Sequence, residues 1–201
     1  MLDLTPATYA VARVVAAVRD DQLDAPTPCD GMSVGALLDR LDGLAQAFTA
    51  AAAKAPIDAG ASVDPSRPGD DWRERIPERL AVLARAWSAD DAWTGMTAAG
   101  GVDLPGEVAG LVALDEVVVH GWDVARSTGQ DLVVGERLVE GALVFVRQAV
   151  AEHPDGSPGL FGPPVPVADD APPLDALLGL TGRDPAWRPD GGAGPAADRR
   201  T

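Results

Sequence analysis

The sequence is poor in the residues that most often carry catalysis or covalent cross-links. Its 201 residues include two histidines, one lysine and one cysteine. The single cysteine, Cys29, has no partner for an intramolecular disulfide. No run of 18 or more apolar residues occurs, and no basic segment followed by a continuous apolar stretch opens the chain, which excludes a spanning helix and a secretory signal. The expected location is therefore cytoplasmic.

Basic residues are also scarce relative to acidic ones. Lys and Arg number 16 against 31 Asp and Glu, so the formal net charge is −15. This charge repels nucleic-acid phosphates and anionic lipid surfaces, and the sequence predicts no nucleic-acid and no membrane partner. The length fits a single domain, and a hydrophobic content of 46% is ample for a core.

Signals for β-strands are few, whereas apolar residues recur at spacings of three and four, which predicts an all-α protein. Ser33 reads as the N-cap of one helix. Four long antiparallel helices with a short extra C-terminal helix and accessory segments are expected in one domain over residues 1–185. Apolar stripes place helices near 11–18, 34–48, 72–87, 107–129, 135–152 and 173–182. Residues 55–70 are expected to form a surface connection and 186–201 a disordered tail.

Chemistry that needs an imidazole has only two places to occur. His153 precedes a proline at the end of a predicted helix and reads as a residue facing water. His120 lies four residues after Glu116, so the two side chains share one helix face and could be metal ligands, an acid and a base, or a simple helix pair. Asp123, one turn beyond, could hold the imidazole by a hydrogen bond. Alternatively, Trp122 belongs to the core and Asp123 bonds a neighbouring helix.

Several motifs resemble those of the mycothiol-dependent maleylpyruvate isomerase-like branch of the DinB-like four-helix bundles, in its actinobacterial metal-binding group. In order and spacing they are Pro26-Thr27-Pro28-Cys29, Ser33-Val34 with Leu37-Leu38, Val117 to Asp123, Phe161-Gly162-Pro163 and Gly182-Arg183-Asp184-Pro185. The resemblance implies a bundle whose second and fourth helices face a small cavity. It also implies a divalent metal held by a His on the second helix and by an acidic residue plus a His on the fourth. Several members of the family use that metal to activate a low-molecular-weight thiol.

Carried over by position, Glu116 and His120 match the ligands on the fourth helix, but the second helix departs from the family pattern. Arg40 stands where the family has its first histidine ligand, and Met32 replaces a tryptophan. A guanidinium has no lone pair to donate to a metal, and two protein ligands are fewer than the three of a usual catalytic zinc site. The expected cofactor is therefore none, or a weakly bound zinc or nickel ion, with mycothiol as a candidate co-substrate.

Arg40 has two readings, which are compatible. It could form a salt bridge with Glu116 that replaces the metal as a structural tie, or it could bind a substrate carboxylate or enolate while Glu116 or His120 moves a proton. The leading hypothesis is a small-molecule enzyme of isomerase, thiol transferase or cyclase type. Its catalytic residues would be Arg40, Glu116 and His120, and Arg40, Trp122 and Asp123 would bind substrate.

Two other functions remain open. One is a non-catalytic protein that binds or sequesters a ligand in the cavity. The other is a metal-dependent mycothiol enzyme with an atypical third ligand beside Glu116 and His120. Cys29 is expected to be a packed structural thiol. Beyond a small-molecule substrate, the expected partner is a second copy of the chain in a homodimer.

Overall fold

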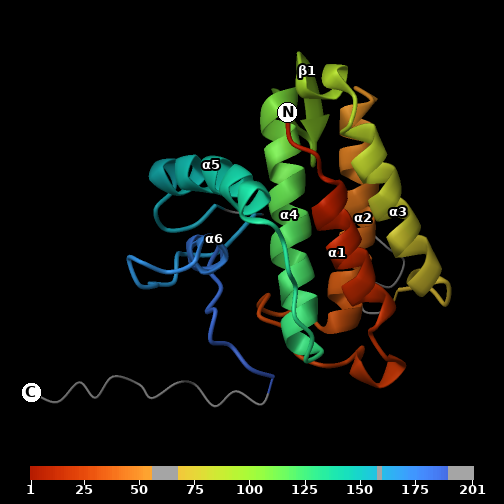
Figure 1. Ribbon diagram of the computed structural model, residues 1–201, viewed down its shortest axis with the longest axis vertical. Helices are drawn as coiled ribbons and strands as arrows, with labels where there is room; N and C mark the ends of the chain where they lie inside the picture. Colours follow the sequence, from red (N-terminus) through yellow and green to blue (C-terminus); the bar gives the residue numbers. More distant parts are fainter. Residues whose placement is uncertain (56–67, 158–159, 190–201) are drawn as a thin grey trace, which may run out of the picture.

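The computed structural model describes residues 1–55, 68–157 and 160–189, and it is mostly helical, as predicted. Four helices form a bundle: α1 (Thr5–Ala16), α2 (Val34–Ala52), α3 (Trp72–Ala86) and α4 (Gly106–Ser127) (Figure 1). Two short 3-10 segments, η1 (Asp20–Gln22) and η2 (Asp90–Trp93), lie between them. Between η2 and α4, the chain forms a hairpin of β1 (Met96–Ala99) and β2 (Val102–Pro105).

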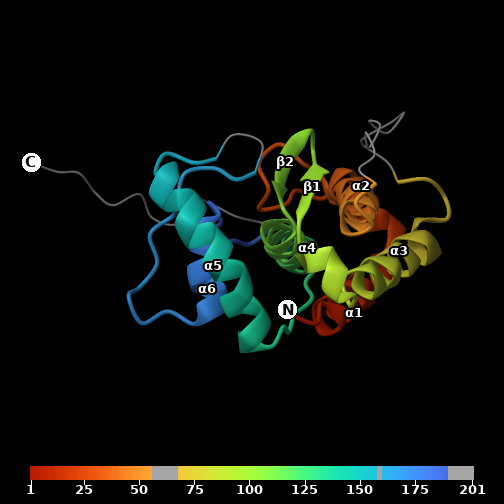
Figure 2. The same ribbon diagram turned by 90° about the horizontal axis from the view of Figure 1, so that it is seen from above.

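Consecutive helices are not always neighbours in the bundle. Seen along the bundle axis, α1 and α2 lie on one diagonal and α3 and α4 on the other (Figure 2). The chain descends through α1 and α4 and ascends through α2 and α3 (Figure 1). The pairs α2–α4 and α1–α3 are therefore antiparallel, whereas α1–α4 and α2–α3 run parallel. The antiparallel pairing places the first half of α2 beside the second half of α4.

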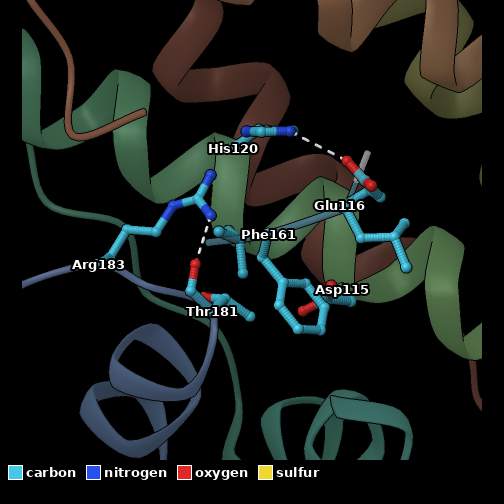
Figure 3. Close-up of a pocket in the computed structure, with 8 residues that line it drawn as sticks. Asp115, Glu116, His120, Phe161, Thr181 and Arg183 are labelled. Carbon is cyan, nitrogen blue, oxygen red and sulfur yellow. Dashed lines mark hydrogen bonds and ion pairs between the residues drawn. The ribbon is translucent and has the colours of Figure 1, made fainter. Parts of the chain in front are cut away.

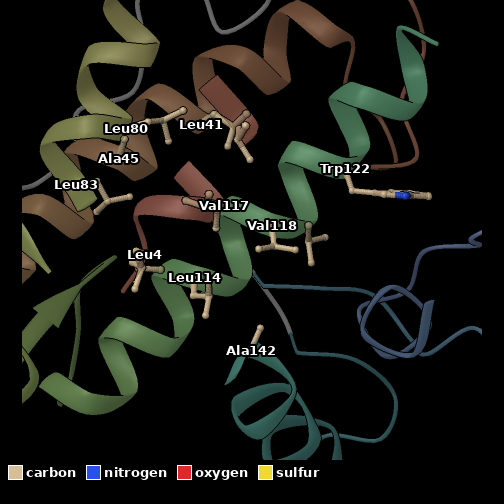
Figure 4. Close-up of a cluster of buried hydrophobic side chains, with 14 of the residues drawn as sticks. Leu4, Leu41, Ala45, Leu80, Leu83, Leu114, Val117, Val118, Trp122 and Ala142 are labelled. Carbon is tan, nitrogen blue, oxygen red and sulfur yellow. The ribbon is translucent and has the colours of Figure 1, made fainter. Parts of the chain in front are cut away.

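The helices form where apolar residues recur along one face, and that face becomes the core (Figure 4). Ser33 begins α2 as predicted, because its hydroxyl accepts a hydrogen bond from the backbone N–H of Ala36. Asp42 on α2 accepts hydrogen bonds from Arg75 and Arg79 on α3, which ties these two parallel neighbours together.

Helix α4 is buried along nearly its whole length. The bundle covers one side of it, and α5 (Glu136–Glu152) packs on another side (Figure 2). Helix α6 (Pro173–Leu180) packs in turn against α5. Because α4 is covered on both sides, any polar side chain that it carries is withdrawn from bulk water and needs a partner within the protein.

The segment after α6 returns to α4. Arg126 donates hydrogen bonds from Nε to the backbone oxygen of Trp187, at 3.0 Å, and from Nη2 to that of Pro185, at 3.2 Å. Most of the predicted surface connection (56–67) and of the predicted tail (190–201) lies outside the described residues. In the part of the chain that the structure describes, no helix is both long and apolar enough to cross a membrane.

Candidate functional site

Three polar residues lie on one face of α4 in its second half. Glu116, His120 and Asp123 are spaced by four and three residues, so their side chains project to the same side of the helix. All three are buried, and Asp123 has no exposed surface at all. The side chains of Glu116 and His120 point toward each other (Figure 3). The structure thus brings together the residues that the helical spacing predicted to be neighbours.

The two ring nitrogens of His120 have different surroundings. Nδ1 lies 3.1 Å from Oδ2 of Asp123, the hydrogen bond that the spacing predicted. Nε2 lies 3.0 Å from Oε2 of Glu116 and 2.8 Å from Nε of Arg40. One ring nitrogen can either donate or accept, so Nε2 donates to Glu116 when the ring is charged and accepts from Arg40 when it is neutral. A single proton therefore decides which of the two neighbours His120 bonds.

The electrostatics of His120 and Glu116 favour an ion pair, with a charged imidazolium beside a charged carboxylate. Burial alone would lower the pKa of His120, but hydrogen bonds to Asp123 and Glu116 raise it above its usual value. Burial alone would raise the pKa of Glu116, but the hydrogen bond to His120 and the nearby charge of Arg40 hold it below its usual value. Glu116 is accordingly ready to accept a hydrogen bond from an imidazolium at Nε2.

Arg40 reaches the site from α2, as the family position predicted. Its Nη2 lies 3.5 Å from Oε2 of Glu116, and a third of its side chain (33%) is exposed. The two atoms that would coordinate a metal, Nε2 of His120 and Oε2 of Glu116, thus both face a guanidinium. A permanent positive charge at that point excludes a divalent cation by repulsion and by occupying the space. The Glu116–His120 pair with Arg40 does not fit a metal ion.

Arg183 also belongs to the site, although sequence reasoning gave it no role. It comes from the turn after α6, and its Nη2 and Nε lie 3.0 and 3.4 Å from the two carboxylate oxygens of Asp123. The carboxylates of Glu116 and Asp123 are therefore each matched by one guanidinium. The signal was present in the Gly182-Arg183-Asp184-Pro185 motif, but 60 residues separate Arg183 from Asp123, and no local pattern connects them.

A small cavity lies between α4, the connection from α5 to α6 and the turn after α6, with room for about one water molecule. Figure 3 shows the residues around it. Asp115 lines the cavity, and its Oδ1 is buried without a hydrogen-bond partner among the described residues. Burial, with the charge of Glu116, raises the pKa of Asp115 to about 8. The cavity is lined by Asp115, Glu116, Val119, His120, Leu160, Phe161, Thr181 and Arg183.

The raised pKa of Asp115 predicts how stability depends on pH. The folded chain keeps this proton up to about pH 8, whereas the unfolded chain releases it near pH 3.8. The stability that Asp115 contributes to the fold therefore declines as the pH rises between these values. Asn cannot titrate. The difference in unfolding free energy between Asp115→Asn and the wild type should therefore change in favour of the variant, by on the order of 1 kcal/mol or more, when the pH is raised from ~5 to ~7.5. Urea unfolding at the two pH values measures this change. Asp131→Asn, which replaces an exposed carboxylate, is the matched control, and an equal difference at both pH values for Asp115→Asn would contradict the prediction.

Trp122, expected to bind substrate, and Cys29, expected to be a packed structural thiol, lie differently with respect to the site. Trp122 is buried on a different face of α4, with the guanidinium of Arg126 5.9 Å from its ring centre, and it is not among the described residues that line the cavity. Cys29 is half-buried, and burial raises the pKa of its thiol, which disfavours a nucleophilic thiolate. Donor atoms of Cys29, His120 and Asp123 lie within 4.8 Å of one another and form a candidate metal-binding group.

The comparisons with known proteins identify a family. The family model described as the mycothiol maleylpyruvate isomerase N-terminal domain matches residues 4–125, which span α1 to α4 and carry Arg40, Glu116, His120 and Asp123. The chain belongs to this family. The family resemblance and the mostly helical fold expected from the sequence are thereby confirmed. Arg183 and the other residues after α4 lie outside the matched region.

Two curated relatives are proteins of Mycobacterium tuberculosis, from strains CDC 1551 / Oshkosh and H37Rv. They are named uncharacterized protein MT0763 and uncharacterized protein Rv0738. Each is 31% identical to this chain over 178 residues, which cover 87% of this chain and 92% of the relative. No solved structure matches the chain significantly. The family is therefore established, whereas the relatives' names assign no activity.

Proposed function

We propose that this member of the maleylpyruvate isomerase N-terminal domain family is a metal-independent acid–base enzyme that acts on a small anionic compound. The observation that supports this function best is the position of Nε2 of His120. It lies within hydrogen-bond reach of a carboxylate, Glu116, and of a partly exposed guanidinium, Arg40. A proton donor, a proton acceptor and an anion-binding group therefore meet at one point.

Arg40 binds the substrate anion. Its Nε and Nη2 face His120 and Glu116, Nη1 forms no hydrogen bond among the described residues, and a third of the side chain is exposed. A guanidinium offers five N–H donors in a fixed fork that suits a carboxylate or an enolate. An arriving anion also competes with Nε2 of His120 for Arg40, which favours the charged imidazole paired with Glu116.

The reaction that fits this arrangement is an isomerisation by proton transfer. Glu116 accepts a proton from a carbon next to the substrate carbonyl, and the imidazolium of His120 returns one from Nε2 to another atom of the same molecule. One bond to hydrogen breaks and one forms, so no oxidant or other co-reactant is consumed. Transfer of the proton from Glu116 to His120 across 3.0 Å then restores both groups. Arg40 stabilises the enolate between the two steps.

Turnover of maleylpyruvate, measured in the presence of a chelator and with or without mycothiol, tests the proposal. Replacing Arg40 with Gln should raise KM about ten- to a hundredfold, because a hydrogen bond to a charged group is lost. Glu116→Gln and His120→Gln should each lower kcat about a hundredfold, since each removes one proton carrier. The exposed Arg85→Gln on α3 is the matched control and should leave both constants unchanged.

Two results would count against this function. One is turnover that persists in the double variant of Glu116→Gln and His120→Gln, since both proposed proton carriers would then be dispensable. The other is turnover that appears only when zinc or nickel is added, since the proposal needs no metal.

A second candidate, a metal-dependent thiol enzyme, is supported by the group of Cys29, His120 and Asp123. An ion there would have to displace Arg183 from the oxygens of Asp123, since both are within 3.4 Å of its nitrogens. This candidate predicts that the wild type binds zinc and that Cys29→Ser abolishes the binding. The first candidate predicts that Cys29→Ser has no effect on turnover.

A further inference from the structure

The segment after α6 lies outside the part of the chain that the family model matches, and yet it supplies a side chain to the site. The guanidinium of Arg183 is almost completely buried. One side of it faces the carboxylate of Asp123, and Nη1 donates a hydrogen bond of 2.7 Å to the backbone oxygen of Thr181, which is visible in Figure 3. Arg183 is thus fixed between its own backbone turn and α4.

Asp123 links Arg183 to His120. Its Oδ2 lies 3.0 Å from Nη2 of Arg183 and 3.1 Å from Nδ1 of His120, and Oδ1 lies 3.4 Å from Nε of Arg183. A carboxylate that is paired with a guanidinium can only accept hydrogen bonds. The nitrogen that faces Oδ2 must therefore carry a hydrogen, which determines the tautomer of the ring.

We propose that Arg183 is a positioning residue: by holding Asp123, it keeps a hydrogen on Nδ1 of His120 and confines proton exchange to Nε2. This inference rests on the proposed function for its purpose, because Nε2 is the nitrogen that faces Glu116 and Arg40. With Nδ1 always a donor, the neutral ring presents a lone pair at Nε2 and the charged ring presents a hydrogen there. The alternative tautomer would place the lone pair toward Asp123, where two acceptors would face each other.

Arg183 could instead serve only to hold the C-terminal segment on α4, and Arg126 separates the two roles. Arg126 also bonds that segment, through the backbone oxygens of Trp187 and Pro185. Among the described residues, none of its hydrogen bonds involves Asp123 or His120. Arg126→Met therefore loosens the same segment without changing the carboxylate, and it is the matched control for Arg183→Met.

The scarcity of histidine allows a direct test. Two-bond proton–nitrogen NMR spectra of the 15N-labelled protein, recorded without substrate, contain signals from His120 and from the exposed His153, which serves as an internal reference. In the wild type and in Arg126→Met, Nδ1 of His120 should have the shift of a nitrogen that bears hydrogen. In Arg183→Met it should move downfield toward that of a nitrogen with a free lone pair, and Arg183→Lys should partly reverse the change.

A hydrogen-bearing Nδ1 in Arg183→Met, unchanged from the wild type, would overturn the inference, and so would a wild type whose Nδ1 lacks the hydrogen. An equal shift in Arg126→Met would also overturn it, because docking of the segment would then suffice. If Arg183→Met does not fold, Arg183→Gln is compared with Arg126→Gln by the same criteria. The spectra need no substrate, so failure of this inference is distinguishable from loss of turnover, which tests the proposed function.

Discussion

Replacing Arg183 with Met should lower the free energy of unfolding by about 3–5 kcal/mol. The side chain of Asp123 has no exposed surface, and Arg183 is the guanidinium that neutralises it. Removing one member of a buried ion pair leaves a charge that water cannot reach, which costs far more than the pair itself contributes. Urea unfolding followed by circular dichroism measures the loss.

A second substitution separates this cause from simple loss of packing. In the double variant Arg183→Met with Asp123→Leu, no buried charge remains without its partner, so part of the lost stability should return. Arg126→Met removes hydrogen bonds to backbone oxygens and the contact with the Trp122 ring, but it leaves no buried carboxylate without its partner, and it should cost about 1–2 kcal/mol. A cost below about 1 kcal/mol for Arg183→Met would show that Asp123 is adequately solvated without Arg183, contrary to this account.

Replacing Gly121 with Ala should destabilise the fold by about 1–3 kcal/mol, although Ala is the better helix former. Gly121 lies in α4 against α1, and an added Cβ would be 2.3 Å from Cγ2 of Val11. The branched side chain of Val11 is stiff, so it cannot turn away without moving the helix. The displaced contact is adjacent to His120, and the site geometry should change with it.

Gly43 on α2 is the matched control, since it is also a helical glycine and an added Cβ would meet nothing within 4 Å. Gly43→Ala should stabilise the protein by about 0.5–1 kcal/mol through helix propensity alone. Adding Val11→Ala to Gly121→Ala should recover part of the lost stability by making room. Thermal unfolding of the three variants and the wild type tests both statements, and a stabilising Gly121→Ala would contradict the close approach of α1 and α4.

Local patterns in the sequence predicted what depends on local spacing. The helical periodicity located the helices, Ser33 was correctly identified as an N-cap, and the spacing of Glu116, His120 and Asp123 placed them on one face. The family resemblance predicted that residue 40 on α2 faces this pair, and the hydrogen bond of Arg40 to His120 agrees with that placement. These features follow from residues three or four apart, or from a position that the family shares.

Features that depend on distant contacts were not predictable in the same way. The periodicity of α5 does not indicate which side of α4 it covers, so the cause of α4's nearly complete burial became clear only in the fold. The role of Arg183 depends on a chain reversal after α6 that no spacing rule encodes. The hairpin was missed as regular structure because each strand has only four residues.

In the function proposed above, the guanidinium of Arg40 takes the place of a metal beside Glu116 and His120. Metal analysis of the protein purified without chelator, in parallel with Arg40→His, tests it most directly. We expect no stoichiometric metal in the wild type and about one zinc or nickel ion per chain in Arg40→His, because the variant supplies the third ligand. Stoichiometric metal in the wild type that is lost in Glu116→Gln, or an Arg40→His variant that binds none, would contradict it.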